Sequence, residues 1–268
     1  MIELNKIYNE DCLEGMKRIP NKSIDMILCD LPYGTTACKW DTVIPFEPLW
    51  EQYRRVIKPN GAIVLTASQP FTSALVVSNL KMFKYDWCWK KSKVTGVLNA
   101  KRQPLRTKED ILIFSNGTPV YHPQGLIPCN KKTGTGVATS GKQGDTTGKI
   151  TQTSDGKYTQ KNTGYPRNVL EIASEGKTVH PTQKPVALFE YLIKTYTNEG
   201  ETVLDNCIGS GTTAIACINT GRNYIGFELD KHYCDIANER VQKGMQDKAV
   251  RERNTTEMEV YLSNKENC

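Results

Sequence analysis

The sequence predicts an α/β fold built on a mostly parallel sheet, and three observations lead to that prediction. Short, nearly continuous apolar runs such as Ile24–Cys29 and Ala62–Ala67 are typical of parallel strands that are buried on both faces. Segments with helical spacing alternate with these runs along the chain. The 268 residues, 38% hydrophobic and 24% charged, suffice for one large globular domain with a substantial insertion and exclude a disordered chain.

The first 115 residues alternate between predicted strands and predicted helices. Apolar spacing predicts helices over Phe46–Ile57 and Gln69–Leu80. A turn at 58–61 (KPNG) separates the first helix from the strand Ala62–Ala67. Asp110–Ser115 (DILIFS) is predicted to be a further strand of the same sheet.

Residues 116–178 differ in character from what precedes them. They are rich in Gly, Thr, Lys, Ser and Gln and have no sustained apolar periodicity. Structureless stretches of this length within a compact domain are usually functional or disordered. We therefore expect an inserted, loop-rich region here.

The α/β pattern resumes at Lys184 and continues to about residue 243. We expect four segments, with one half of the main domain over 1–115, the insert over 116–178, the other half of the main domain over 179–245 and a tail over 246–268. In the tail we expect a solvated helix end and one last edge strand. The elements predicted after the insert are the helix Pro185–Tyr196, the strand Thr202–Asp205, the helix Thr212–Thr220, the strand Asn223–Glu228 and the helix Lys231–Lys243.

Charge is concentrated in the middle of the chain. Residues 84–179 carry a net charge of +9, whereas the rest of the chain carries −3. This distribution favours a polyanionic partner, although a solvated basic surface would give the same counts.

Cysteine spacing and hydropathy point to a cytoplasmic protein without a metal site. None of the nine cysteines forms a C-x-x-C pair, which favours reduced, buried thiols. No apolar run is long enough to span a membrane, and the first residues lack the apolar stretch of a signal peptide.

The stretch VLDNCIGSGTTAIA, residues 203–216, has the composition of a nucleotide-binding turn. The predicted strand ends in Asp205, the turn contains Gly209 and Gly211, and a helix follows. Glycines let a ligand approach the backbone, and a helix N-terminus offers free N–H groups. About twenty residues later a second strand ends in Glu228, at the spacing of an acid that binds ribose hydroxyls.

The same stretch excludes two familiar nucleotide motifs. The turn lacks the third glycine of the dinucleotide fingerprint, and no Gly-Lys-Ser/Thr of a phosphate loop follows it. Asp205 would repel a pyrophosphate, but it suits a cationic ligand with an amino acid end. S-adenosylmethionine, which carries a sulfonium and an α-amino group, is therefore the predicted cofactor.

The stretch CDLPYG, residues 29–34, places an acid directly after a buried strand. Open α/β sheets bind ligands at the carboxyl ends of their strands, where the strand order reverses. If the strands that end at Asp30 and Asp205 are neighbours, both carboxylates face one crevice. Taken alone, the pattern D-x-P-x-G at 30–34 could equally be an ordinary capped turn at the end of a strand.

These residue types suit the activation of an exocyclic amine on a nucleobase. The lone pair of such an amine is delocalised into the ring, so acceptors aimed at its N–H bonds make the nitrogen a better nucleophile. The Asp30 carboxylate and the Leu31 carbonyl are suitable acceptors, and Pro32 fixes the turn. Tyr33 can stack on a base swung out of the helix.

Together the motifs resemble those of the amino-group DNA methyltransferases, specifically the β class. This resemblance implies a circularly permuted Rossmann-like methyltransferase fold, with a mostly parallel seven-stranded sheet and helices on both faces. It implies methyl transfer from S-adenosylmethionine to adenine N6 or cytosine N4 by a bacterial or phage enzyme, with a target-recognition region over the insert. The matching stretches are DLPY at 30–33, DNCIGSGTT at 205–213, YIGFELD at 224–230 and HPTQKP at 180–185.

The resemblance makes 1–115 the catalytic half and 179–245 the cofactor-binding half, and it also assigns roles to single positions. Asp30, Leu31, Pro32 and Tyr33 would hold the target base. Asp205 and its glycine turn would surround the methionine part of the cofactor, Glu228 the ribose and Asp11 the adenine, while His180, Thr182 and Lys184 would close the pocket. The cofactor-binding residues implied are Asp11, Cys12, Asp30, His180, Thr182, Lys184, Asp205, Cys207, Gly209, Ser210, Gly211, Thr212, Glu228 and Leu229.

Two positions depart from the family pattern. Leu31 replaces the usual first proline of the signature, and Cys207 replaces the usual aromatic residue before the glycine turn. The fine geometry of the turn and one wall of the cofactor pocket are the features that these departures affect.

Basic residues of the middle segment are the candidates for DNA contacts. Trp87 and Trp89 could stack on bases, although core positions are favoured. Without the family, HPTQKP would be interpreted as a surface turn before a helix. The DNA-binding candidates are Lys90, Lys91, Arg102, Arg106, Lys131 and Lys132.

The sequence thus predicts a site-specific methyltransferase that acts on double-stranded DNA. An aspartate at the first signature position favours adenine N6, and cytosine N4 is the alternative. RNA or protein methylation and a catalytically silent DNA-binding module are further alternatives. A homodimer and a cognate restriction endonuclease are partners that the resemblance leaves open.

Overall fold

The computed structural model describes residues 2–35, 41–134, 157–176 and 183–266. The chain divides into two compact units. The first comprises Met1–His122 and Asn168–Cys268, and the second comprises Pro123–Arg167.

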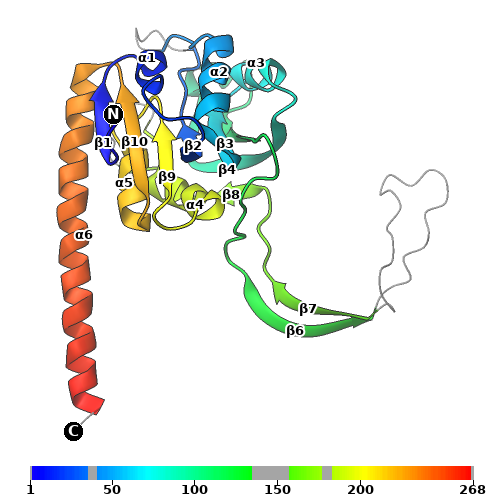
Figure 1. Cartoon of the computed structure of the whole chain (residues 1–268). Coiled ribbons are helices and arrows are strands. Elements are labelled where there is room, and N and C mark those ends of the chain that lie inside the picture. The colour runs from blue at the N-terminus through cyan, green and yellow to red at the C-terminus, as the bar shows by residue number, and fades with distance from the viewer. Residues whose placement is uncertain (1, 36–40, 135–156, 177–182, 267–268) are drawn as a thin grey trace. The chain divides into compact units, whose positions relative to one another are not determined.

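An eight-stranded sheet forms the centre of the first unit, in the order β1-β10-β9-β2-β3-β5-β4-β8 (Figure 1). The strands β1, β10, β9, β2 and β3 are parallel to one another, β5 is antiparallel to both β3 and β4, and β8 is parallel to β4. Their bounds are β1 Lys6–Asn9, β2 Ile24–Cys29, β3 Ile57–Ala67, β4 Phe83–Thr95, β5 Arg106–Phe114, β8 Val169–Glu171, β9 Thr202–Asp205 and β10 Asn223–Glu228.

Helices cover both faces of this sheet, as predicted. Side chains alternate along β2, so that Met26 and Leu28 belong to one core cluster while Ile27 and Cys29 belong to the other. The first cluster packs under α4, α5 and α6, and the second under α1, α2 and α3. The helices are α1 Cys12–Met16, α2 Phe46–Val56, α3 Phe71–Ser78, α4 Val186–Tyr196, α5 Thr212–Thr220 and α6 Lys231–Glu266, with a 3₁₀ turn η1 at Val97–Asn99.

Glycine determines both ends of α5. Gly211 at its start has φ +84°, and Gly221 at its end has φ +72°, a left-handed conformation that favours glycine. A Cβ on Gly211 would lie 3.1 Å from Cβ of Ala237, so glycine also lets α5 approach α6 closely.

The strand order places a topological switch point between β2 and β9. The chain leaves β2 toward β3 on one side, and it leaves β9 toward β10 on the other. Because β2 and β9 are parallel neighbours, their carboxyl ends open onto the same crevice, where open α/β sheets bind ligands.

Several expectations from the sequence need correction. The sheet has eight strands rather than seven, because β8, from within the predicted insert, pairs with β4. The turn predicted at 58–61 is a bulge within β3, since Ile57 pairs with Ile24 and Ala62 pairs with Met26. The tail contains no edge strand in its described part, because α6 continues to Glu266.

The second unit contains regular structure that the sequence did not reveal. The antiparallel strands β6 (Ile127–Gly134) and β7 (Lys157–Thr163) form a two-stranded sheet, with Ile127 opposite Thr163. Both strands are composed mostly of polar residues, so they carry no sustained apolar alternation to detect. Among the described helices, none is long and apolar enough to span a membrane.

Candidate active site

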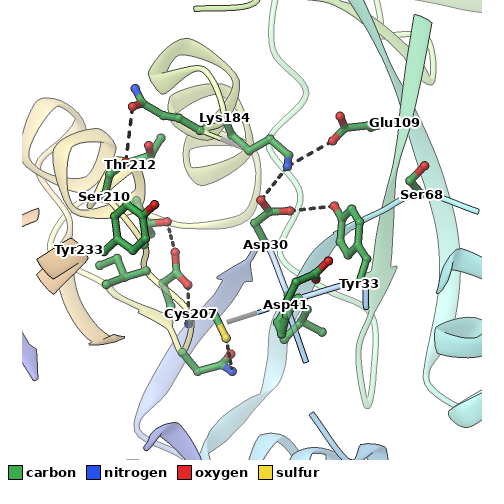
Figure 2. A pocket seen from close by; sticks show the side chains of 18 of the residues that line it. Asp30, Tyr33, Asp41, Ser68, Glu109, Lys184, Cys207, Ser210, Thr212 and Tyr233 are labelled. Carbon is green, nitrogen blue, oxygen red and sulfur yellow. Dashed lines mark hydrogen bonds and ion pairs between the residues drawn. The ribbon is translucent and has the colours of Figure 1, made fainter. Parts of the chain in front are cut away.

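A cavity of about 830 Å³ lies at the switch point of the sheet (Figure 2). Asp30, directly after β2, and Asp205, at the end of β9, both line it. The two acids that the sequence placed at separate strand ends therefore face one shared space. Its size is at the upper end of the range typical of small-molecule sites.

Most of the predicted site residues line this cavity. Gly211 does not, because it lies against Ala237 beneath the turn. His180 and Thr182 lie outside the described residues. Those that line it are Asp11, Cys12, Asp30, Leu31, Pro32, Tyr33, Lys184, Asp205, Cys207, Gly209, Ser210, Thr212, Glu228 and Leu229.

The carboxylate of Asp30 is held by three side chains. Its Oδ1 accepts hydrogen bonds from the hydroxyl of Tyr33, at 2.7 Å, and from the hydroxyl of Thr66. Its Oδ2 lies 2.6 Å from Nζ of Lys184 (Figure 2). Because a carboxylate offers about four acceptor positions, one remains on Oδ2 for a donor that enters the cavity.

Lys184 joins Asp30 to a second acid. Its Nζ also lies 3.2 Å from Oε2 of Glu109, while Oε1 of Glu109 pairs with Nζ of Lys91 at 3.0 Å. The side chain of Lys184 is 7% exposed, so its charge is compensated by these carboxylates rather than by water. Burial opposes the charge on Lys184, but Asp30 and Glu109 outweigh it and raise its pKa above the usual value.

Tyr33 presents an aromatic ring beside this ion pair. Its ring stacks on Phe71 with centroids 5.2 Å apart, and Nζ of Lys184 lies 5.7 Å from the ring centroid. Shielding from solvent, followed by the charge of Asp30, raises the pKa of Tyr33 well above its usual value. The phenol therefore stays neutral, and its O–H donates a hydrogen bond to Asp30.

Asp205 is buried at the opposite side of the cavity. Its Oδ1 accepts the N–H of Cys207 at 3.0 Å, and its Oδ2 accepts the hydroxyl of Thr213. Burial raises the pKa of Asp205 to about 7, which the bonds from Thr213 and Cys207 only partly oppose. A cationic ligand at this carboxylate would favour its ionised form.

Glu228 braces the glycine turn. Its Oε2 accepts the N–H of Gly209 at 2.9 Å, and its Oε1 accepts the N–H of Asp230 at 2.9 Å. Each oxygen keeps a further acceptor position, which suits the two hydroxyls of a ribose. Gly209 adopts φ +53°, with no atom within 4 Å of where a Cβ would lie, so the turn leaves open space on that side.

A further part of the cavity wall is formed by Asp11, Cys12 and Cys207. Oδ1 of Asp11 caps α1 by accepting the N–H groups of Leu13 and Glu14. Nδ2 of Asn206 lies 3.6 Å from the sulfur of Cys12 and 3.5 Å from that of Cys207. The pKa values of both thiols are raised, so they remain neutral and form a polar but uncharged wall.

The predicted DNA-binding residues fall into three groups. Lys91 lines the cavity and is paired with Glu109, and Lys90 is exposed and paired with Glu171. Arg102 is exposed in the β4–β5 connection, and Arg106, the exposed first residue of β5, lines the cavity. Lys131 and Lys132 belong to β6 in the second unit.

Trp87 and Trp89 are core residues, as the sequence favoured. Each is 3% exposed, and the indole N–H of Trp87 donates to the hydroxyl of Tyr196 at 2.7 Å. The indole N–H of Trp89 donates to the carbonyl of Ile172 at 2.8 Å. Neither ring is available for stacking on a base from solution.

Sequence reasoning missed three residues that shape the cavity. Glu109 was counted only as a negative charge, but it supports Lys184. Asp41 accepts the N–H groups of Gly34 and Thr35 at 2.8 and 2.9 Å and so fixes the loop after the signature. Tyr233 of α6 lines the cavity beside the glycine turn (Figure 2). The bonds of Asp41 reach back six and seven residues and form no Asx turn, so none of the three residues had a sequence signal.

No group of three or more metal-ligating side chains lies within the described part of the chain. The polar groups that line the cavity fit S-adenosylmethionine. A buried carboxylate suits its ammonium group, a second carboxylate suits its ribose, and an open glycine turn lets it approach the backbone.

Comparison with known proteins agrees with this chemistry. A family model described as DNA methylase, of the N6/N4 methyltransferases, matches residues 24–239. The type II methyltransferase M1.MboII of Moraxella bovis is 28% identical over 89% of this chain and 96% of its own length. The type II methyltransferase M.HpaI of Haemophilus parainfluenzae is 28% identical over 88% of this chain and 74% of its own.

Solved structures give the same result. The crystal structure of the M1.HpyAVI–SAM complex is 27% identical, with a TM-score of 0.59 over 88% of this chain and 98% of that one. The PvuII cytosine-N4-specific DNA methyltransferase has a TM-score of 0.60 over 90% of this chain and 91% of that one. At 16% identity the likeness to PvuII shows the fold alone.

Proposed function

The chain belongs to the N6/N4 DNA methylase family, and on that premise we propose that it methylates adenine N6 at a specific site in double-stranded DNA. The family is S-adenosylmethionine-dependent, and the bound cofactor supplies an electrophilic methyl group. The observation that carries the proposal is the shared cavity onto which Asp30 and Asp205 both open.

In this proposal the residues after β2 hold the target amine. The remaining acceptor position on Oδ2 of Asp30 takes one N–H, and the carbonyl of Leu31 takes the other. These two bonds draw the nitrogen out of conjugation with its ring and aim its lone pair into the cavity. Leu31 is 3% exposed and its side chain is anchored in the core, which fixes its backbone in spite of the missing proline.

The aromatic ring of Tyr33 stacks on a base that has left the helix. Phe71 supports the ring from behind, so it cannot turn away when the base enters. Asp205 and Glu228 take the ammonium and ribose ends of the cofactor on the other side of the cavity, with Asp11 and Cys12 at its adenine. The methyl donor and the amine thus approach one another between β9 and β2.

The choice of adenine over cytosine rests on Asp30 itself, because cytosine N4 enzymes of this family more often carry serine at that position. The test uses labelled cofactor and duplex DNA, followed by digestion to nucleosides. Label in N6-methyl-2′-deoxyadenosine is the expected result, and label in N4-methyl-2′-deoxycytidine would replace this proposal with the alternative. Competition by RNA would reveal whether DNA is the preferred substrate.

A catalytically silent DNA-binding module is the rival from another class. The complete set of Asp30, Tyr33, Asp205 and Glu228 in one cavity argues against it. The rival predicts tight DNA binding with no label transferred under any condition, whereas the proposed enzyme transfers label to DNA that contains its site.

For the insert over 116–178 we propose recognition of the DNA sequence. Lys131 and Lys132 on β6, together with Arg102 and Arg106 of the first unit, would contact phosphates. Affinity for duplex DNA should then fall steeply as salt rises from low to moderate concentration. Affinity that is indifferent to salt would contradict these contacts.

A further inference from the structure

The connection between β4 and β5 is an ordered tip rather than a loose loop. Thr95 pairs with Arg106 at its base. Gly96 begins the tip with φ +85°, and η1 follows at Val97–Asn99. The N–H of Asn99 donates to the carbonyl of Gly96 at 3.0 Å, and the N–H of Arg102 donates to that of Asn99 at 2.8 Å. These bonds hold the end of the connection in one conformation.

This tip presents apolar side chains to solvent. Leu98 is fully exposed, at 102% of its reference area, and Val97 beside it is 64% exposed. Val94 and Leu105 on the flanks are also exposed. A single exposed apolar residue is ordinary, but four of them on one ordered connection, with about 1.5–3 kcal/mol of burial forgone at Leu98 alone, indicate an interaction surface.

Positive charge surrounds the apolar tip. There is no acidic residue between Asp86 and Glu109 in the sequence. Lys101, Arg102 and Arg106 are exposed, and within the described residues no carboxylate pairs with any of them. An apolar tip flanked by unpaired cations is complementary to a polyanion that has an apolar interior. Duplex DNA is such a polyanion, because its stacked bases lie between two phosphate backbones.

The tip also adjoins the cavity. Lys93, Thr95 and Arg106, which form its base, line the same cavity as Asp30 and Tyr33. A duplex whose extruded base enters this cavity must therefore pass close to the β4–β5 connection. The continuity with the target site favours DNA over an anionic membrane surface as the occupant.

We propose that Leu98, supported by Val97, is a wedge that enters the base stack of duplex DNA and fills the space that the extruded target base leaves. This inference rests on the proposed function and deepens it, since it names the element that keeps the target base out of the helix. Leucine is among the apolar residues that proteins insert between base steps. Lys101, Arg102 and Arg106 hold the phosphates on either side of the wedge.

The test compares wild type with Leu98→Ala on two duplexes that differ only in whether the target base has a pairing partner. The variant removes exposed atoms only, so folding is not at risk. On the fully paired duplex, kcat/KM of Leu98→Ala should fall about tenfold or more, because unstacking costs a few kcal/mol. With an abasic site opposite the target, extrusion costs little, and the two proteins should agree within about twofold.

A matched control is Val77→Ala on α3. Val77 is 70% exposed, carries a similar apolar side chain and does not line the cavity. It should behave as wild type on both duplexes. Equal rates of Leu98→Ala and wild type on the paired duplex would overturn the wedge, as would an equal loss on both duplexes.

A second readout separates failure of the wedge from failure of the proposed function. A fluorescent purine at the target position brightens when it leaves the stack, whether or not methyl transfer follows. Absence of transfer by the wild type would contradict the proposed function alone. Equal brightening with Leu98→Ala and wild type would overturn the wedge. Binding to anionic vesicles tests the membrane alternative: if Leu98→Ala lost vesicle binding while its kinetics on duplex DNA stayed unchanged, the wedge would also be overturned.

Discussion

The carboxylate of Asp30 and the ammonium of Lys184 lie 2.6 Å apart, although 154 residues separate them in the chain. The ion pair connects the residue that follows β2 to a residue just before α4, and both residues line the cavity. The resemblance implied that Lys184 closes the cofactor pocket, and that role stays a prediction. Because Nζ of Lys184 bonds to Asp30, we propose that Lys184 also positions this carboxylate, a role that can be separated from cofactor binding.

Replacing Lys184 by methionine tests that role. The side chain keeps its length, but Asp30 loses the bond from Nζ to its Oδ2. Without that bond, Oδ2 is no longer held so that its one remaining acceptor position faces the substrate. We expect kcat to fall about ten- to a hundredfold, the equivalent of one charge-assisted hydrogen bond, while the Kd for S-adenosylmethionine changes less than about twofold. Lys184→Arg should restore part of the rate.

Lys91→Met is the matched control, because Lys91 pairs with Glu109 and makes no ion pair with Asp30 in the described part of the chain. Its loss of rate should be smaller than that of Lys184→Met. A large rise in the Kd for the cofactor with kcat unchanged would return Lys184 to the cofactor pocket.

Tyr33 offers two separable contributions. Tyr33→Phe removes the hydrogen bond to Asp30 but keeps the ring stacked on Phe71. It should lower kcat only about five- to tenfold, because Thr66 still donates to the same oxygen of Asp30 and the ion pair with Lys184 remains. Tyr33→Ala removes the stacking surface as well and should raise the KM for DNA in addition. Single-turnover rates and DNA titrations measure the two effects, and identical behaviour of both variants would contradict a stacking role.

Cofactor affinity should depend on pH through Asp205. Burial raises its pKa to about 7, so below that pH the carboxyl is protonated and must ionise to pair with the cofactor's ammonium group. Affinity therefore weakens as pH falls, and the Kd should rise roughly five- to tenfold between pH 7.5 and pH 6. Asp205→Asn should bind weakly with a flatter profile. Calorimetric titration of wild type with an unchanged Kd over this range would contradict the assignment.

Two glycines of the turn differ in what a side chain would meet. Gly209→Ala and Gly211→Ala both place alanine at positive φ, which costs about 1–2 kcal/mol. Only at position 211 does the added Cβ also press on Ala237. Urea unfolding should thus show a larger loss for Gly211→Ala. Equal losses for the two variants would mean that the contact between α5 and α6 can relax freely.

The fold could be predicted in outline because its signals are local. Ile24–Cys29 and Thr202–Asp205 are buried strands whose apolar runs and terminal acids stand out in the sequence, and the structure gives them the same bounds. The strands β6 and β7 escaped prediction because their sequences are mostly polar and carry no apolar alternation. The long α6 was cut short because the sequence after residue 243 is mostly polar and charged and shows no clear apolar stripe.

The site could be predicted residue by residue, but not as a network. The motifs located Asp30 and Asp205, and strand neighbourhood then brought them together as expected. The link from Lys184 to Glu109 depends on how β5 lies beside the cavity, which no spacing within either segment encodes. Burial of Lys184 is equally a tertiary property, and on its own the stretch around it would be interpreted as a surface turn.

The most direct test of the account is single-turnover methyl transfer by Asp30→Ala, measured with saturating labelled cofactor and duplex DNA at matched folded fractions. Asp235→Ala, which removes an exposed acid of α6 that pairs only with Lys231 among the described residues, is the control. Asp30→Ala should still bind the cofactor but transfer label at least about a hundredfold more slowly, because the target amine loses a charged acceptor. Wild-type rates in folded Asp30→Ala would contradict the account.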